Sequence, residues 1–539
     1  MRKALYLFAL LTLIACSSDH QLNDRIYNGQ VLHIGNGTEP QDLDPHTVTG
    51  VPELKLNMAL FEGLLARHPE SLELIPAIAK SWHHNDSENS YTFHLRNNAK
   101  WSNGDPLTAN DFVYSWRRLM HPLLGNEYAT NNYAIVNAEA YHKNEIIDFE
   151  QVGIKALNDY TLEFVLREKN PMFLQAMADR NTFPVHQATI EAHGKMTDRG
   201  TRWTRPENIV SNGPFKLLKW EPNNIITMVK NPNYWDRDKV LLNAMHFYPI
   251  ENLSTEERMF RTGRLQLTTT GYIPTDKIKI YQEEYPDKIT ITPIYATYFY
   301  LINTEKKPFD DVRIRKALAL SIDRQSIVDN VIKGGQKPAY SLNPPDPNGY
   351  LPASGVGYDT EKAKQLLAEA GYPNGEGFPS FEILYNTVEH HRKIALTIQQ
   401  MWKNTLGIDA TLTNQEWKVY LNTRKEKQYS IARAGSVGSF NDPVDFLDTY
   451  TSESGMNDTG WSNSRFDQLI NQASQIKNKE ERFSLFQEAE KILTDEVPLI
   501  PIYYYTKIKL KSPKVMGWHE NLLDHPYYKG VYIQTDTNP

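Results

Sequence analysis

Cysteine is almost absent from this sequence. Cys16 is the only cysteine among 539 residues, so no disulfide can form within the chain. A chain of this length is well above the size at which a single hydrophobic core stops growing. We therefore expect two or three lobes, each with its own core and with room for a ligand between them.

A strong charge of one sign and long hydrophobic runs are also absent. The formal net charge is −7, and lysine and arginine are scattered among the acidic residues. This pattern lacks a basic patch that could follow a phosphate backbone, which argues against nucleic acid as a partner. The apolar run over residues 4–15 is shorter than the roughly 20 residues needed to span a bilayer. With 40% hydrophobic and 23% charged residues, the composition is that of a water-soluble globular protein.

The N-terminus has the pattern of an export signal. Two basic residues precede the apolar run 4–15, and the small residue Ala15 stands directly before Cys16. The pattern predicts that residues 1–16 are a bacterial lipoprotein signal and that Cys16 becomes the lipidated first residue of the mature chain. Because two or more acyl chains hold a protein stably on a membrane, we expect a lipid-anchored protein in the periplasm or on the outer face of the cytoplasmic membrane. The alternative is a plain secretory signal with an incidental cysteine.

Sequence motifs of catalysis and metal binding are missing. The chain contains no G-x-x-x-x-G-K-[ST] phosphate loop, no G-x-G-x-x-G turn and no H-E-x-x-H metal helix. The nearest approach to a serine nucleophile elbow, residues 434–438, lacks the first glycine of G-x-S-x-G. The adjacent histidines at 83–84 and 390–391 are poor chelators, because neighbouring side chains point about 100° apart on a helix and to opposite faces of a strand. We predict that the protein is not an enzyme and carries no cofactor.

Strand-like and helix-like segments alternate along the chain, which predicts mixed α/β lobes. Alternating polar and apolar residues predict a strand over 90–96. A helix is expected to begin after Thr108, with Asp111 as its reciprocal capping residue. A longer helix is expected from Asp311 to the glycines at 334–335.

A series of short segments carries a resemblance to a known family. The segments are 74–82, 91–96, 101–104, 109–116, 211–215, 231–235, 309–318, 322–324, 414–417 and 502–505. In content and order they resemble the oligopeptide-binding proteins of bacterial ABC importers. A single segment could occur by chance, but the ordered series extends over essentially the whole chain after residue 24.

The resemblance implies an α/β, three-lobed periplasmic-binding-protein fold of the type II-like class, with a hinge and a ligand cleft between the lobes. Lobe I is expected at 17–61, 186–295 and 506–539, lobe II at 62–185, and lobe III at 296–505. The resemblance further implies that the protein captures oligopeptides and delivers them to ABC transporter permease subunits. We also expect a monomer. Relatives close like a hinge around an extended peptide, and backbone pairing lets them accept many sequences.

The resemblance also identifies the expected ligand-binding residues. They are Val51, Tyr114, His391, Trp417, Arg424, Arg433, Gly435, Ser436, Val437 and Ser439. Val51 matches a segment that contacts the peptide backbone, while Tyr114 and Trp417 match aromatic positions of the cleft. Core packing is the alternative role for each of these three residues.

Basic positions near the ligand are matched by His391, Arg424 and Arg433. The resemblance associates His391 and Arg433 with the C-terminal carboxylate of the peptide. Arginine suits this task because its planar fork can meet a carboxylate with two parallel hydrogen bonds. A structural salt bridge is the alternative role for the arginines.

The segment 432–443 departs from the family pattern. The family usually has an aspartate where Ser439 stands, and that carboxylate binds the α-amine of the peptide; some members have tryptophan where Ser436 stands. A buried ammonium without its partner costs about 3–5 kcal/mol. One hypothesis is a ligand with a modified, neutral or differently placed amine. The other is that Asp442 or Asp445 replaces the lost carboxylate and ordinary peptides bind.

Other functions stay open at this point. The same scaffold could bind cell-wall peptides, nickel complexes, haem or sugars, because a fold does not fix a function. A secreted hydrolase would need an assembled nucleophile and base, for which the sequence gives no pattern. An adhesin or signalling receptor would need only the lipid anchor, so ligand affinity distinguishes it from a binding protein.

Overall fold

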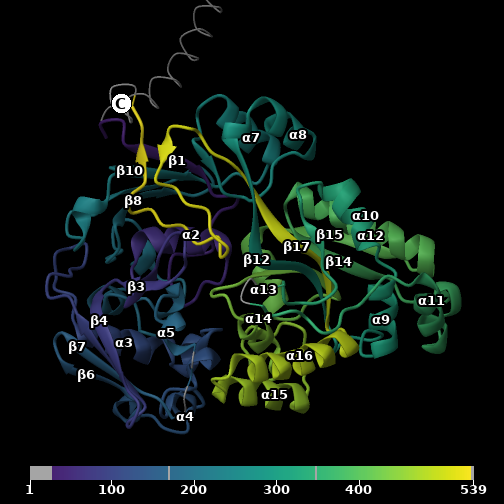
Figure 1. The fold of residues 1–539 in the computed structure, drawn as a ribbon, viewed down its shortest axis with the longest axis horizontal. Coiled ribbons are helices and arrows are strands. Elements are labelled where there is room, and N and C mark those ends of the chain that lie inside the picture. The colour runs from purple at the N-terminus through teal and green to yellow at the C-terminus, as the bar shows by residue number, and fades with distance from the viewer. Residues whose placement is uncertain (1–26, 168–169, 171, 346–348, 536–539) are drawn as a thin grey trace, which may run out of the picture.

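The computed structural model describes residues 27–167, 170, 172–345 and 349–535. The predicted export signal and Cys16 lie outside the described residues. The described chain is mixed α/β, and its larger sheets have five, four and six strands. We call the parts built around these sheets lobe I, lobe II and lobe III, in that order. Figure 1 shows lobe I at the upper left, lobe II below it and lobe III on the right.

Lobe I is built on a five-stranded sheet in the order β11-β1-β10-β9-β8. Helix α2 packs on this sheet, and its Leu56 and Leu60 are fully buried in the core of the lobe. The strands are β1 (Val31–Gly35), β8 (Phe215–Glu221), β9 (Ile225–Lys230), β10 (Ala244–Tyr248) and β11 (Leu267–Thr268), with the small pair β18 (Val515–Met516) and β19 (Tyr532–Ile533). The helices are α2 (Val51–Leu60), α6 (Gln187–Glu191), α7 (Leu253–Arg261) and α8 (Thr275–Glu284).

Lobe II is built on a four-stranded antiparallel sheet in the order β4-β5-β7-β6. The predicted cap of its main helix is present, because the Asp111 carboxylate accepts the backbone N–H of Thr108 at 2.7 Å. The strands are β2 (Leu65–Arg67), β3 (Leu74–Pro76), β4 (Ala79–Asn85), β5 (Ser90–Leu95), β6 (Ile154–Asn158) and β7 (Thr161–Val165). The helices are α3 (Ala109–Leu119), α4 (Ala138–His142) and α5 (Phe173–Ala176). The strand predicted over 90–96 is confirmed as β5.

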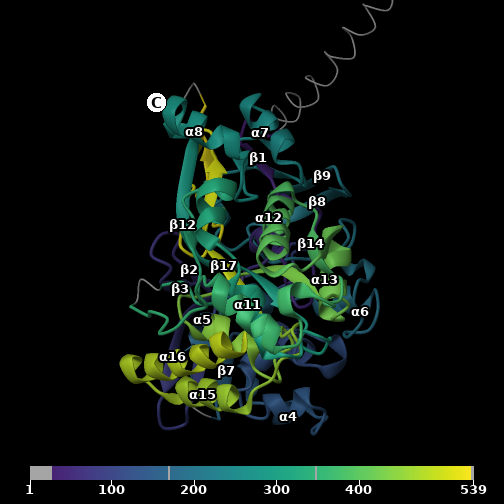
Figure 2. The same ribbon diagram turned by 90° about the vertical axis from the view of Figure 1, so that its right-hand side faces the viewer.

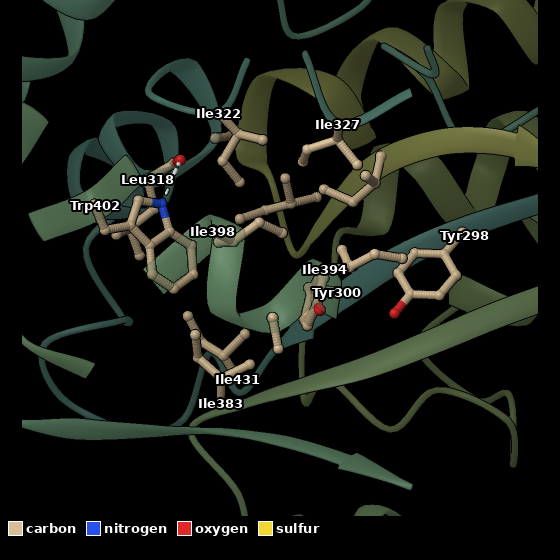
Figure 3. Packing of buried hydrophobic residues seen from close by; sticks show 14 of the residues in the cluster. Tyr298, Tyr300, Leu318, Ile322, Ile327, Ile383, Ile394, Ile398, Trp402 and Ile431 are labelled. Atoms are coloured by element: carbon tan, nitrogen blue, oxygen red, sulfur yellow. Dashed lines mark hydrogen bonds between the residues drawn. The ribbon is translucent and has the colours of Figure 1, made fainter. Parts of the chain in front are cut away.

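Lobe III is built on a six-stranded mixed sheet in the order β13-β17-β12-β16-β14-β15. The strands are β12 (Ile289–Ile302), β13 (Lys337–Pro338), β14 (Phe381–Asn386), β15 (Ala410–Gln415), β16 (Ile431–Val437) and β17 (Leu499–Leu510). The helices are α9 (Val312–Leu320), α10 (Arg324–Ser326), α11 (Thr360–Glu369), α12 (Glu389–Leu406), α13 (Trp417–Lys425), α14 (Val444–Leu447), α15 (Ser464–Gln475) and α16 (Lys479–Glu496). Figure 3 shows part of the core beneath this sheet, where the Trp402 indole N–H donates to the carbonyl of Leu318 at 3.0 Å.

The single helix predicted from Asp311 to the glycines at 334–335 is wrong. Helix α9 ends at Leu320, and α10 begins after a break, continuing as a π-helix over Ile327–Ile332. The break has a local cause: the Asp323 carboxylate accepts the backbone N–H of Ser326 and so caps a new helix.

Strands β12 and β17 connect lobe I to lobe III. They pair antiparallel from Ile289 to Leu301, with register irregularities after Pro293 and Tyr298. Their lobe I ends pack with α7 and α8, and Figure 2 shows the two strands side by side below α8. The lobe boundaries expected at 295 and 505 therefore fall inside continuous strands, where no loop marks them.

Lobes I and II are joined by a buried ion pair. Arg118 of α3 donates from two guanidinium nitrogens to the two carboxylate oxygens of Asp44, at 3.0 and 2.6 Å. Both side chains are at most 1% exposed. Burial raises the pKa of Asp44, but the Arg118 charge and hydrogen bonds outweigh burial and hold the pKa below its ordinary value.

Candidate functional site

Two cavities lie where lobe III faces the other lobes. A cavity of about 240 Å³ lies between lobes I and III, and one of about 600 Å³ lies between lobes II and III. Val437 and Met456 line both, so the cavities are two sections of one cleft. We call the smaller section the basic cavity and the larger one the acidic cavity, after their charged residues.

The charged side chains are distributed unevenly between the two sections. The basic cavity is lined by Lys55, Arg199, Arg424, Lys425, Arg433 and Lys507, against Glu127, Glu251 and Asp458. The acidic cavity is lined by Glu139, Asp179, Asp445, Asp448, Glu453 and Asp467, against Arg167 and Arg482. The cleft is therefore polarised, and it suits a ligand with a negative group at one end and a positive group at the other.

The start of helix α2 forms the lobe I wall of the basic cavity. Gly50, Val51 and Pro52 line it directly. Glu53, one residue further, is fully buried and accepts the indole N–H of Trp417 from lobe III at 3.3 Å. Gly50 is required by space, because a Cβ there would lie 2.0 Å from a Glu53 oxygen and 3.0 Å from the Trp417 ring.

Arg433 of β16 presents a buried positive charge to the basic cavity. Its guanidinium donates to the Tyr505 hydroxyl at 2.6 Å and lies 4.7 Å from the centre of the Tyr298 ring. The Nε atom is buried without a hydrogen-bond partner, and no carboxylate of the described residues forms an ion pair with this arginine. A buried guanidinium in this state is well prepared to bind a ligand anion.

His391 lies beside this guanidinium on helix α12. It is 3% exposed, and its Nδ1 lies 3.4 Å from the Tyr298 hydroxyl. Burial, together with the Arg433 charge, lowers the pKa of His391 well below its ordinary value. The ring is therefore neutral and can offer a hydrogen bond to a carboxylate without adding charge.

Arg424 also lines the basic cavity, but Asp458 already neutralises its charge. It donates from Nε and Nη2 to one oxygen of Asp458, at 3.0 and 2.6 Å. This is the structural salt bridge that was the alternative role for this residue.

The end of β16 runs from the basic into the acidic cavity. Gly435 lines the first, Val437 both, and Ser436 and Ser439 the second. A Cβ at Gly435 would lie 2.8 Å from the Tyr505 hydroxyl, so the glycine leaves room for the Tyr505–Arg433 contact.

Of the two acids that could replace the missing aspartate, only one is free to do so. Asp442 is buried and forms an ion pair with Arg482. Asp445 lines the acidic cavity, accepts the backbone N–H of Ser439 at 2.6 Å and has no ion-pair partner among the described side chains. Burial raises the pKa of Asp445 to about 8, and the nearby Asp179 of lobe II adds to the rise. A ligand ammonium would favour the ionised form of this carboxyl.

Tyr114 is placed elsewhere. This residue of α3 is 4% exposed and packs in the core cluster of lobe I, and it lines neither section of the cleft. The resemblance implied an aromatic cleft position, whereas in the described structure Tyr114 has the core-packing role that was its alternative.

Several residues of the cleft were not found by sequence reasoning. Lys55 lies one turn beyond Val51 on α2, so the same segment match could have pointed to it. Lys507, Asp179 and Asp448 come from distant segments without a motif, and only the fold brings them to the cleft.

Side-chain contacts between the described residues cross the cleft and link lobe III to the other lobes. Besides the Trp417–Glu53 hydrogen bond, Lys425 of lobe III reaches Glu127 of lobe II at 2.6 Å. Lys143 of lobe II reaches Glu453 of lobe III at 2.9 Å. Closure by such rim contacts is the motion expected of lobes that enclose a ligand.

The described part of the chain shows neither a membrane span nor a metal site. None of its helices combines the length and the apolar character needed to cross a bilayer. No group of three or more His, Cys, Asp or Glu side chains within the described ranges could hold a metal ion.

Comparison with known proteins supplies the family. The model of the bacterial extracellular solute-binding proteins, family 5 Middle, matches residues 73–458. The periplasmic oligopeptide-binding protein OppA of Salmonella typhimurium is 36% identical over 99% of this chain and 98% of its own. The periplasmic murein peptide-binding protein MppA of Escherichia coli is 35% identical over 93% of each chain.

Solved structures of relatives support the same family, and they also indicate how the lobes of this chain are arranged. The complex of Haemophilus influenzae OppA with the peptide RPPGFSPFR superposes with a TM-score of 0.89 at 34% identity, covering 94% of this chain and 99% of that one. The unliganded open form of MppA has the same identity of 34% and covers 94% of this chain and 97% of its own, but its TM-score is 0.63. The arrangement of the lobes described here is therefore the closed one. With a family model that covers most of its length and relatives that match it from end to end, the chain belongs to the bacterial extracellular solute-binding proteins of family 5.

Proposed function

We propose that this protein captures oligopeptides outside the cytoplasm and delivers them to the permease of an ABC importer. The observation that carries the proposal is the polarised closed cleft, with Arg433 at one end and Asp445 at the other, neither of which forms an ion pair with a described side chain. A peptide is a zwitterion whose charges lie at its two ends, so it complements this arrangement. The names of the relatives OppA and MppA support the same class of ligand.

At the basic end, Arg433 and His391 receive the C-terminal carboxylate. The guanidinium supplies charge and the neutral imidazole supplies a hydrogen bond. Between the ends, the residues at the start of α2 and the end of β16 line the cleft and offer backbone groups to an extended peptide.

At the acidic end, Asp445 takes over the amine-binding role that the family gives to an aspartate at the position of Ser439. The Ser439 backbone N–H holds the carboxylate in place. Asp179 from lobe II lies near enough to raise the pKa of Asp445, so the site is completed only when lobe II approaches lobe III. Ordinary peptides with a free amine are then the expected ligands, even though Ser439 stands where the family usually has an aspartate.

The remaining attributes belong to the same proposal. The protein acts as a monomer without catalytic activity, and Cys16 anchors it by lipid in the periplasm or at the outer face of the cytoplasmic membrane. Two relatives of this chain have the printed names "Probable deoxycholate-binding periplasmic protein YgiS" and "Heme-binding protein A". A cleft with opposite charges at its two ends favours a zwitterionic peptide over either of these ligands.

The proposal is tested by titrating ligand-free protein. Protein is denatured to remove bound ligand, refolded, and titrated by calorimetry with trialanine, tetra-alanine, deoxycholate and haem. We expect the peptides to bind at micromolar concentration or below and the other two ligands to bind at least about 100-fold more weakly. Tight binding of deoxycholate or haem without peptide binding would overturn the proposal.

A further inference from the structure

The basic cavity contains more positive charge than one carboxylate would need. Besides Arg433, it is lined by Lys55 of α2 and Lys507 of β17. Arg433 is 9% exposed, Lys507 7% and Lys55 5%. Buried cations are costly unless they are paired, so a group of three in one small cavity calls for an explanation.

The partners of Lys55 within the protein are neutral. Its ammonium donates to the backbone carbonyl and the hydroxyl of Thr269, the latter at 2.9 Å. Among the described residues no carboxylate lies within ion-pair distance of it. Two acids of lobe I act on Lys55 from beyond ion-pair distance, Asp524 more strongly than Glu256; Asp524 pairs with Lys507 and Lys509, and the Glu256 carboxylate accepts from Thr270 at 2.6 Å. Burial, and next the charge of Lys507, lower the pKa of Lys55 to about 7.

Lys507 has only a shared partner. Its ammonium lies 3.2 Å from Asp524, which also receives Lys509 at 2.7 Å; Lys509 has Glu520 as a second acid at 2.6 Å. Asp524 therefore pairs with two lysines and also acts on Lys55, so the positive charge on the cavity side is only partly neutralised.

Strand β17 carries both Lys507 and the tyrosine that binds Arg433, and both residues line the basic cavity. Tyr505 binds Arg433, and Lys507 follows it two residues later. Residues two apart lie on the same face of a strand, about 7 Å from each other. Glutamate carries a second carboxylate four bonds from its main-chain carboxylate, so both can lie in one cavity.

We infer that the basic cavity holds two carboxylates of one ligand residue, the C-terminal carboxylate at Arg433 and a second one between Lys55 and Lys507. The inference rests on the proposed function and names its substrate class: peptides whose C-terminal residue is acidic. The second carboxylate gives Lys55 an anion at ion-pair distance, which no described side chain supplies.

The test compares two peptides that differ only in this charge. Ligand-free protein is titrated by calorimetry with Ala-Ala-Ala-Glu and Ala-Ala-Ala-Gln, and with Ala-Ala-Glu-Ala to control for the position of the acid. We expect the peptide with C-terminal Glu to bind at least about tenfold tighter than the one with Gln, because a charge-assisted hydrogen bond in a buried site changes the affinity by about this factor. The peptide with internal Glu should not share the advantage.

Variants assign the preference to the two lysines. In Lys55→Met and in Lys507→Met the Glu/Gln ratio should fall to within about threefold, while the affinity for the Gln peptide persists. Lys55→Arg keeps the charge and should keep the preference, and Lys279→Met, at an exposed site on α8, should keep it as well. Methionine retains most of the apolar stem of each lysine, on α2 and on β17. Thermal unfolding of each variant identifies any loss of folding.

The outcomes separate this inference from the proposed function. If the wild type binds both peptides equally, or if the preference survives in both methionine variants, the two-carboxylate subsite is refuted and peptide capture stands. If none of the peptides binds, the proposed function fails and this inference fails with it.

Discussion

Asp445 allows the sharpest test of how this protein recognises a peptide. The substitution Asp445→Asn removes the negative charge but keeps a side-chain oxygen that can accept the Ser439 N–H. Only the interaction with the ligand amine is then changed. In a wild-type complex this amine is enclosed between Asp445 and the lobe II wall of the acidic cavity, which includes Asp179.

The size of the effect follows from the burial of the pair. Removing one partner of a buried ion pair typically costs about 3–5 kcal/mol. Asp179 remains in the variant and retains part of the attraction, so we expect the lower end, about 3 kcal/mol, which is roughly a 100-fold loss of affinity. Acetylating the peptide amine removes the same interaction from the other side, and the two changes together should cost little more than either alone.

Calorimetric titration with free and N-acetylated trialanine measures this double-mutant cycle. The wild type should prefer the free amine by about 100-fold, and Asp445→Asn should bind both forms within about threefold of each other. Asp238→Asn, at a side chain that is 96% exposed on lobe I, serves as the matched control and should retain the preference. If Asp445→Asn keeps the full preference for the free amine, Asp445 is not the counter-ion and the reasoning is refuted.

Three further predictions concern stability and closure. Asp44→Asn leaves the Arg118 guanidinium buried without its anion and should lower the free energy of unfolding by about 3–5 kcal/mol in urea titrations, whereas an effect below about 1 kcal/mol would show that the pair is dispensable. Burial raises the pKa of Glu490 from its ordinary 4.5 to about 7, so between these values the folded state keeps a proton that the unfolded state releases, and stability falls as pH rises. Relative to Glu490→Gln, the wild type should therefore lose up to about 3 kcal/mol between pH 4.5 and 8, and parallel pH profiles would contradict this. Trp417→Phe should remove most of the intrinsic fluorescence change on peptide binding, because this indole contacts Glu53 only across the closed cleft; an unchanged signal would assign it to another tryptophan.

The sequence predicts well those features that depend on neighbouring residues or on an ordered series of segments. The helix cap at Thr108 is such a feature, because both partners lie within one turn. The cleft positions of Val51, His391, Trp417 and Arg433 follow from segment matches, and they line one cavity in the structure.

The errors and gaps arise where distant residues compete or cooperate. Asp442 and Asp445 look equivalent along the chain. Only the fold shows that Asp442 already forms an ion pair with Arg482 of α16. Arg424 resembles a ligand residue until Asp458 is seen beside it. Likewise, Lys55 and Lys507 come from opposite ends of the chain, and no local pattern indicates that they line one cavity.

The helix break has a different cause, and the expected lobe boundaries lie at positions that no local pattern marks. The predicted helix after Asp311 has apolar residues at helical spacing throughout, but the Asp323 carboxylate finds a better partner in the Ser326 N–H and starts a new helix. The boundaries at 295 and 505 fall within β12 and β17, because each strand serves two lobes in turn. A composition shift cannot mark a boundary that lies inside a strand.

The most direct test of the central claim is to identify what the protein carries. Protein purified under native conditions from the cells that produce it is denatured, and the released small molecules are analysed by mass spectrometry. We predict a mixture of short peptides with free amines and free C-terminal carboxylates. A single non-peptide compound in stoichiometric amount would contradict peptide capture as the function of this cleft.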